Sequence, residues 1–154
     1  MQAASLNLKT VFGDLVRIET RLYNAVNDRL RARHGLFASQ FEFLSYLRNH
    51  PKSRVADLAA YFAIGVGATS KGIDRLEAQD LVRRLPNPED GRSSLLELTE
   101  TGAAQVDTAE RTLDEHLVAL FGAAIDPARC EQFADAVALL RRFLEQENIG
   151  TPAG

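Results

Sequence analysis

The sequence has one cysteine and no long hydrophobic run, and each shortage excludes a class of protein. Cys130 alone cannot form an intrachain disulfide or a zinc site built from several cysteines. We expect it to be an ordinary small helix residue and not a redox sensor, because thiol reactivity needs an activating environment. No run of about 18 apolar residues exists, and the N-terminus lacks the basic and apolar regions of a secretory signal. These shortages predict a cytoplasmic protein.

Patterns that indicate an enzyme or a metal site are also missing. His34, His50 and His116 have no cysteine or histidine at the spacing of metal ligands. The pair Gly65-x-Gly67 is too short for a dinucleotide fingerprint and does not follow a strand. We therefore predict no cofactor, no metal and no catalytic residue, and an unrecognised enzyme stays as an alternative.

The chain has the composition of a single globular domain spanning residues 1–154. It is 45% hydrophobic and 25% charged, which is ordinary for a soluble protein. Its formal net charge of −3 argues against indiscriminate coating of nucleic acid. Docking to DNA depends on local charge, so the net charge does not exclude it.

Residues 54–101 have the order of a helix-turn-helix motif followed by a hairpin. The first helix is predicted over residues 54–63. In the second helix, the spacing predicts one buried face that consists of Val66, Thr69, Ile73 and Leu76. Its opposite face is small, polar and partly basic: Gly67, Ala68, Ser70, Lys71, Asp74 and Arg75. Small residues allow close approach, while serine and lysine donate to phosphates and base edges, so this is the expected recognition helix.

The hairpin after the second helix predicts a wing. Residues 81–85 and 95–98 are the expected strands, and residues 86–93 form a tip rich in turn-forming residues. Arg92 at the tip is suited to a narrow, electronegative minor groove. The alternative is an ordinary solvated hairpin.

Residues 64–77 (IGVGATSKGIDRLE), 80–84 (DLVRR) and 87–102 (NPEDGRSSLLELTETG) resemble the MarR (multiple-antibiotic-resistance regulator) family of winged-helix transcription factors. The resemblance implies a mainly helical fold with a small β-hairpin wing, and a dimeric DNA-binding regulator that is expected to be a repressor. Two departures are Gly65, where the family has a Ser or Thr cap, and Gly72, where a larger residue is common. Gly72 is expected to make the recognition helix less rigid without DNA.

The expected DNA contacts divide by role. Ser70 and Lys71 are predicted to read bases, with Gly67 and Ala68 permitting close approach. The predicted phosphate contacts are Arg75, Arg83 and Arg84. The predicted wing contacts are Arg92, which enters the minor groove, and Ser93, with Asp90 orienting Arg92 as the resemblance implies. A winged helix used for protein contacts, without an effector ligand, is the alternative function.

Long amphipathic helices at both ends predict a homodimer. The first is expected over about residues 8–33, and Ser39 with Glu42 is expected to cap the second. Further helices are expected from Thr99 to about residue 122 and from about Pro127 onward. We assign residues 39–101 to the DNA-binding module, and residues 6–34 and 102–147 to dimerisation, because one subunit leaves surplus apolar surface. A monomeric helical bundle is the alternative.

The resemblance also implies a pocket for a small aromatic acid or phenol between the helical region and the winged helix. The residues that we expect to line it are Tyr23, Arg17, His34, Phe43 and Arg54. Residues 15–36 are similar to the urate-responsive subset, although Tyr23 stands where that subset favours tryptophan. The alternative is that Tyr23 and Phe43 fill the core and that Arg54 faces solvent.

Overall fold

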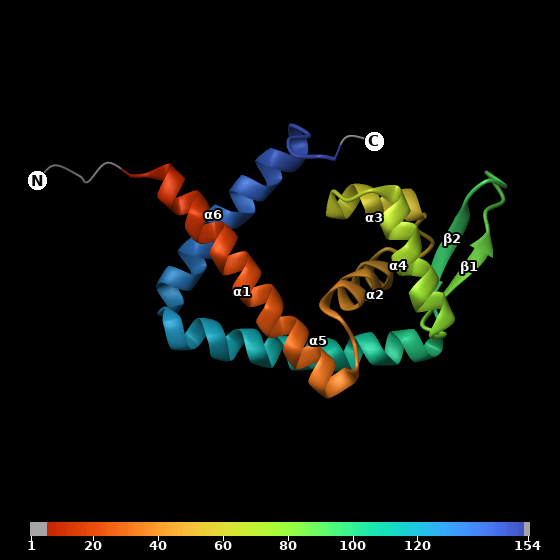
Figure 1. The fold of residues 1–154 in the computed structure, drawn as a ribbon, viewed down its shortest axis with the longest axis horizontal. Coiled ribbons are helices and arrows are strands. Elements are labelled where there is room, and N and C mark those ends of the chain that lie inside the picture. The colour runs from red at the N-terminus through yellow and green to blue at the C-terminus, as the bar shows by residue number, and fades with distance from the viewer. Residues whose placement is uncertain (1–5, 153–154) are drawn as a thin grey trace, which may run out of the picture.

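The computed structural model describes residues 6–152, which contain six helices and one two-stranded antiparallel sheet (Figure 1). The mainly helical winged fold predicted from the sequence is confirmed. The elements in chain order are α1 Leu8–His34, α2 Ala38–Asn49, α3 Val55–Phe62, α4 Val66–Ala78, β1 Val82–Pro86, β2 Ser94–Leu98, α5 Glu100–Ala124 and α6 Pro127–Gln146.

Most helix ends follow local signals in the sequence. Gly35 ends α1 in a left-handed conformation with φ of 65°, as glycine does after many helices. Asp126 caps α6 by accepting a hydrogen bond from the Arg129 N–H at 3.0 Å, and Pro127 is the first helical residue.

The predicted cap of α2 is wrong, because the helix begins at Ala38 and Ser39 lies inside its first turn. Two amide side chains satisfy the first backbone donors instead. The Gln40 Oε1 atom accepts from the Phe37 N–H at 2.9 Å, and the Asn27 Oδ1 atom accepts from the Ala38 N–H at 2.9 Å. With these donors already bonded, the helix starts one residue before the serine.

The core lies among α2, α3, α4, the sheet and the first half of α5, with one buried residue from α1. Aliphatic side chains dominate it, and two phenylalanines of α2 complete it. Its buried members are Leu30, Leu36, Phe41, Phe43, Leu44, Leu47, Leu58, Ile73, Leu76, Leu81, Val82, Leu96, Val106 and Ala109.

The start of α5 is tied to the start of the wing. The Thr99 N–H donates to the Leu81 carbonyl at 3.1 Å, and the Thr99 Oγ1 atom accepts from the Gly102 N–H at 3.0 Å. A Cβ atom on Gly102 would lie 2.0 Å from the Leu81 carbonyl oxygen. Only glycine therefore lets α5 begin this close to the strand that leads into the wing.

The N-terminal half of α1 extends away from the winged part, and α5 leads from the wing to the start of α6, whose C-terminal end turns back toward α3 (Figure 1). No residue of α6 is buried. Large apolar side chains on α1 and α6 are exposed, including Leu8, Phe12, Val16, Leu139, Leu140 and Phe143. Among residues 6–152, no helix is long and apolar enough to cross a membrane.

Candidate nucleic-acid interface

The buried face of α4 fixes the direction of the recognition helix. Thr69, Ile73 and Leu76 are fully buried, as predicted. Val66 is not, since its side chain is 57% exposed. Side chains of a helix lean toward its N-terminus, so a side chain at the first helical position points beyond the packed surface. Gly65 caps the helix, as expected, and its carbonyl accepts a hydrogen bond from the Thr69 hydroxyl at 2.9 Å.

The opposite face of α4 is open. Gly67, Ala68, Lys71 and Arg75 are exposed, and Ser70 is half-buried. This surface combines low relief with two cations, which suits close approach to a polyanion.

Gly72 has a packing role that the sequence did not reveal. A Cβ atom at this position would lie 2.7 Å from the Cε2 atom of Phe43, so the glycine lets α4 pack directly against α2. The expectation that Gly72 only loosens the recognition helix is therefore incomplete, because the glycine also brings the helix into contact with the core.

The wing is a short, regular hairpin in which Val82 pairs with Leu98 and Pro86 pairs with Ser94. Its tip is held by side-chain contacts with the backbone. The Asp90 Oδ1 atom accepts from the Arg92 backbone N–H at 2.9 Å. Asp90 thus sets the backbone of Arg92, and the recorded contact does not involve the guanidinium group. Arg92 itself is exposed.

Ion pairs divide the predicted DNA-binding cations into two groups. Arg84 pairs with Asp74 at 2.8 Å and with Glu77 at 3.0 Å, and its side chain is only 23% exposed. Arg83 pairs with Glu97 across the sheet at 2.8 Å. Asp74 and Glu77 lie on α4, so the sequence of the wing could not show them, whereas Glu97 lies opposite Arg83 within the hairpin.

The other three cations are unpaired. In the part of the chain that the structure describes, no ion pair involves Lys71, Arg75 or Arg92. The structure therefore offers these three cations directly to a polyanion, whereas Arg83 and Arg84 are already engaged.

Arg54 stands at the N-terminal end of α3 and pairs with Asp57. Its Nη2 atom lies 3.0 Å from Asp57 Oδ1, and the Arg54 backbone N–H donates to Asp57 Oδ2 at 2.8 Å. Hydrogen bonds from Arg54 hold the pKa of the Asp57 carboxyl below its ordinary value. The pair closes the first turn of α3.

The remaining residues predicted for the effector pocket are dispersed. Phe43 is in the core beside Phe62, with ring centroids 5.5 Å apart, and His34 Nε2 lies 2.7 Å from Thr112 Oγ1 of α5. Arg17 pairs with Asp14 on the exposed side of α1. No hydrogen bond, ion pair or aromatic contact within residues 6–152 joins any two of the five predicted residues.

Tyr23 lies close to Glu42 of α2. Burial raises the pKa of the Glu42 carboxyl, the Glu19 charge raises it further, and a hydrogen bond from Tyr23 lowers it. Burial, followed by the charge of Glu42, raises the pKa of the Tyr23 hydroxyl. These mutual effects indicate that Tyr23 of α1 and Glu42 of α2 are neighbours.

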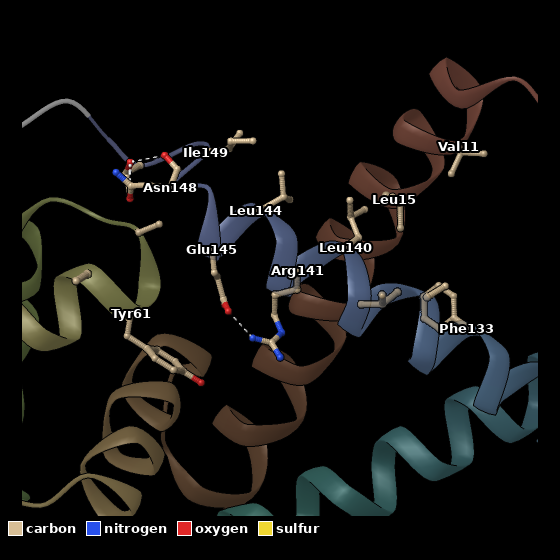
Figure 2. A pocket seen from close by; sticks show the side chains of 15 residues that line it. Val11, Leu15, Tyr61, Phe133, Leu140, Arg141, Leu144, Glu145, Asn148 and Ile149 are labelled. Atoms are coloured by element: carbon tan, nitrogen blue, oxygen red, sulfur yellow. Dashed lines mark hydrogen bonds and ion pairs between the residues drawn. The ribbon is translucent and has the colours of Figure 1, made fainter.

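A mainly apolar cavity of about 620 Å³ lies between α1, α3 and α6 (Figure 2). Tyr61 of α3 borders it on one side, and Leu15 of α1 with Leu140 of α6 borders it on the other. The Arg141–Glu145 ion pair, at 2.7 Å, is its main polar feature. Tyr61 is 60% exposed, and no motif in the sequence pointed to it. Throughout residues 6–152, no cluster of side chains suits a metal ion.

Comparison with known proteins agrees with this geometry. The sequence model of the MarR family matches residues 34–93. The transcriptional repressor NicR of Pseudomonas putida is 38% identical over 96 residues, covering 62% of this chain and 60% of NicR. The match therefore spans less than two thirds of NicR.

The multiple antibiotic resistance protein MarR of Escherichia coli is 32% identical over 104 residues, covering 63% of this chain and 72% of MarR. In fold, the chain is similar to the MarR family regulator Sco3205 of Streptomyces coelicolor, solved in complex with DNA, with a TM-score of 0.82 and 19% identity. That alignment covers 98% of this chain and 97% of Sco3205. The chain belongs to the MarR family of winged-helix transcriptional regulators, which are not enzymes.

Proposed function

We propose that the chain is a homodimeric repressor that binds a pseudo-palindromic operator through α4 and the wing. The observation that carries the proposal is the open face of α4, with unpaired Lys71 and Arg75, beside a wing whose tip presents unpaired Arg92. NicR is described as a transcriptional repressor and Sco3205 was solved in complex with DNA, and both support the proposal by analogy.

The proposed roles of the side chains follow from their surroundings. Ser70 and Lys71 read base edges, and Gly67 with Ala68 lets the helix lie deep in the major groove. Arg75 holds a phosphate. Arg83 and Arg84 act as secondary phosphate contacts, because each must first leave a carboxylate.

Arg92 enters the minor groove in this proposal, where narrow A·T-rich segments attract arginine. Asp90 fixes the backbone of the wing tip, so that Arg92 is presented outward. Ser93 stabilises the same turn, since its hydroxyl accepts from the Asn87 side-chain amide at 3.0 Å.

The proposed dimer forms through α1 and α6 together with α5. Several large aliphatic and aromatic side chains on α1 and α6 are exposed, and exposed apolar patches mark interaction surfaces. The cavity of Figure 2 is part of this surface, and in the proposal a second copy of the chain covers it. Two recognition helices related by a two-fold axis require half-sites about one helical turn apart.

We also propose that a small aromatic acid or phenol lowers the affinity for the operator, with urate among the candidates. The support is the resemblance of residues 15–36 to the urate-responsive subset and the connection of α1 to α2 through Tyr23 and Glu42. A ligand can release DNA only if it prefers a conformation that does not fit the operator. Movement of α1 against α2 would change the distance between the recognition helices.

Fluorescence anisotropy with a selected genomic operator tests the first part of the proposal. We expect sub-micromolar affinity and a steep fall of the association constant with salt, because phosphate contacts release counterions. A protein-interaction module would show neither property. Arg142→Ala removes an exposed arginine of α6 and, once its oligomeric state is shown to equal that of the wild type, is the control for general charge effects.

Titration of the operator complex with salicylate and with urate tests the effector. We expect release of DNA from the wild type and weaker release from Tyr23→Ala. A screen of aromatic acids that leaves operator affinity unchanged at millimolar concentrations would remove the effector from the proposal and leave the DNA-binding function intact.

A further inference from the structure

Val66 is an apolar side chain that the folded chain leaves uncovered at the start of the recognition helix. It is the first residue of α4, and its side chain is 57% exposed. The spacing of the apolar residues predicts a buried position, yet Val66 does not belong to the buried core. The other three residues of the predicted face are fully buried. The DNA contacts proposed above leave Val66 without a role.

The residues on either side of Val66 have no side chains. Gly65 caps the helix, and Gly67 is its second residue. A Cβ atom added at either glycine would contact no other element within 4 Å, so the surface around both is open. Among residues 65–67, only Val66 therefore projects a side chain from the end of the helix.

The position of Val66 on α4 is one that faces base pairs. The first residues of a recognition helix contact base edges when the helix lies in the major groove. Val66 and Ser70 are four residues apart, so they are neighbours on the helix surface, and Ser70 is one of the proposed base readers. Valine is branched at Cβ and has few side-chain orientations in a helix, so it loses little freedom on contact. Val66 thus offers DNA a rigid apolar group beside a hydroxyl group.

An apolar side chain can recognise only one feature of the major groove. The C5 methyl group of thymine is apolar, whereas the other base edges present hydrogen-bond donors and acceptors. Valine has no polar side-chain atom, so against a G·C pair it would displace water from those groups without replacing the hydrogen bonds. Against thymine, two apolar surfaces leave water together, which is favourable.

We propose that Val66 is a specificity-determining residue that contacts the 5-methyl group of one thymine in each half-site of the operator. The inference rests on the proposed binding of α4 in the major groove, and it adds the identity of one base to that proposal. Ser70 and Lys71 read polar base edges, while Val66 reads the apolar one. A two-fold dimer makes the contact twice, at symmetry-related positions of the operator.

Replacement of thymine by deoxyuridine tests the contact, because it removes the methyl group and keeps the base pairing. Each thymine of the selected genomic operator is replaced in turn, together with its symmetry mate, and the affinity is measured by fluorescence anisotropy. At one position we expect wild-type binding to weaken about fourfold per half-site, or about fifteenfold in all, as burial of one methyl group implies. Val66→Ala should bind the unmodified operator more weakly by at least a similar factor. It should not distinguish thymine from deoxyuridine at that position.

Lys71→Ala is the matched control on the same helix. It removes a cation of the DNA-binding surface, so its affinity for the operator should fall, but its ratio of affinities for thymine and deoxyuridine should equal that of the wild type. Val66→Ala should keep the wild-type midpoint of urea unfolding or exceed it, because alanine is the better helix former at an exposed position. A loss of binding by this variant then reports the contact with DNA and not unfolding.

The outcomes separate this inference from the proposed function. Wild-type binding that no thymine replacement weakens would overturn the role of Val66 and leave operator binding intact. A replacement that weakens the wild type and Val66→Ala equally would do the same, because another residue or the shape of the DNA would then sense the methyl group. A wild type that binds no genomic fragment would overturn both proposals.

Discussion

Replacing glycine by alanine at two positions of α5 should change stability in opposite directions. At Gly102 the new Cβ atom would lie 2.0 Å from the Leu81 carbonyl oxygen, so the two backbone segments must separate by over an ångström. The carbonyl cannot turn away freely, because it accepts the Thr99 N–H at 3.1 Å. At Gly122 the added methyl group meets no atom within 4 Å.

The expected magnitudes follow from these surroundings. An alanine in an open helical position is favoured over glycine by about 0.5–1 kcal/mol, so Gly122→Ala should raise the free energy of unfolding by that amount. Overpacking costs about 1–3 kcal/mol, and rigid backbone at Leu81 places Gly102→Ala at the upper end. After the helical gain is subtracted, Gly102→Ala should lose about 2 kcal/mol. The two variants should therefore differ by about 3 kcal/mol.

Urea unfolding followed by circular dichroism measures this difference. With a slope of about 1–3 kcal/mol per molar urea, the midpoints of the two variants should lie about 1 M or more apart. All samples need the same protein concentration, because association stabilises the folded state. A midpoint for Gly102→Ala equal to or above that of the wild type would refute the close contact between α5 and the wing strand.

Three other predictions concern the wing, α3 and the proposed dimer. Arg92→Ala should weaken operator binding by about 1–3 kcal/mol if it reads base edges, and unchanged affinity at moderate salt would exclude the wing. The pKa of Asp57 is lowered in the folded state, so its contribution to stability exists above the ordinary pKa of 3.8 and is lost as the pH falls through the folded value. Acid unfolding of Asp57→Asn should lack this loss, and a profile identical to that of the wild type would contradict it. Deletion of residues 130–154 should give aggregates or unfolded chain, whereas a folded, soluble monomer in light scattering would disprove an obligate dimer.

The sequence predicts the fold well where the signal is local. Gly35, Thr99 and Pro127 mark helix boundaries through their own backbone and side-chain chemistry, and the structure has boundaries at these positions. The cap at Ser39 failed because Asn27, eleven residues earlier in the chain, supplies a competing acceptor to the Ala38 N–H. A local pattern cannot reveal an acceptor from another helix.

The site was predicted less completely, because charge and contact are properties of the folded chain. Lys71 and Arg92 remain available as expected, while Arg84 has partners on α4 that the wing sequence does not show. Phe43 was proposed as a ligand contact because it is aromatic and lies on α2. Its ring is instead packed against Phe62 and the open side of Gly72. Composition identifies residues capable of binding, and packing decides which of them are accessible.

The ion pairs also explain how a chain of net charge −3 can present a basic face. Arginines hold two carboxylates of the winged part: Arg84 pairs with Asp74, and Arg83 pairs with Glu97. The pairs neutralise acidic groups that would otherwise repel phosphate within a Debye length of about 8–10 Å. Lys71, Arg75 and Arg92 then determine the local sign of the potential. On this reasoning, Arg84 supports DNA binding chiefly by covering Asp74 and Glu77, and its direct contact with a phosphate is secondary.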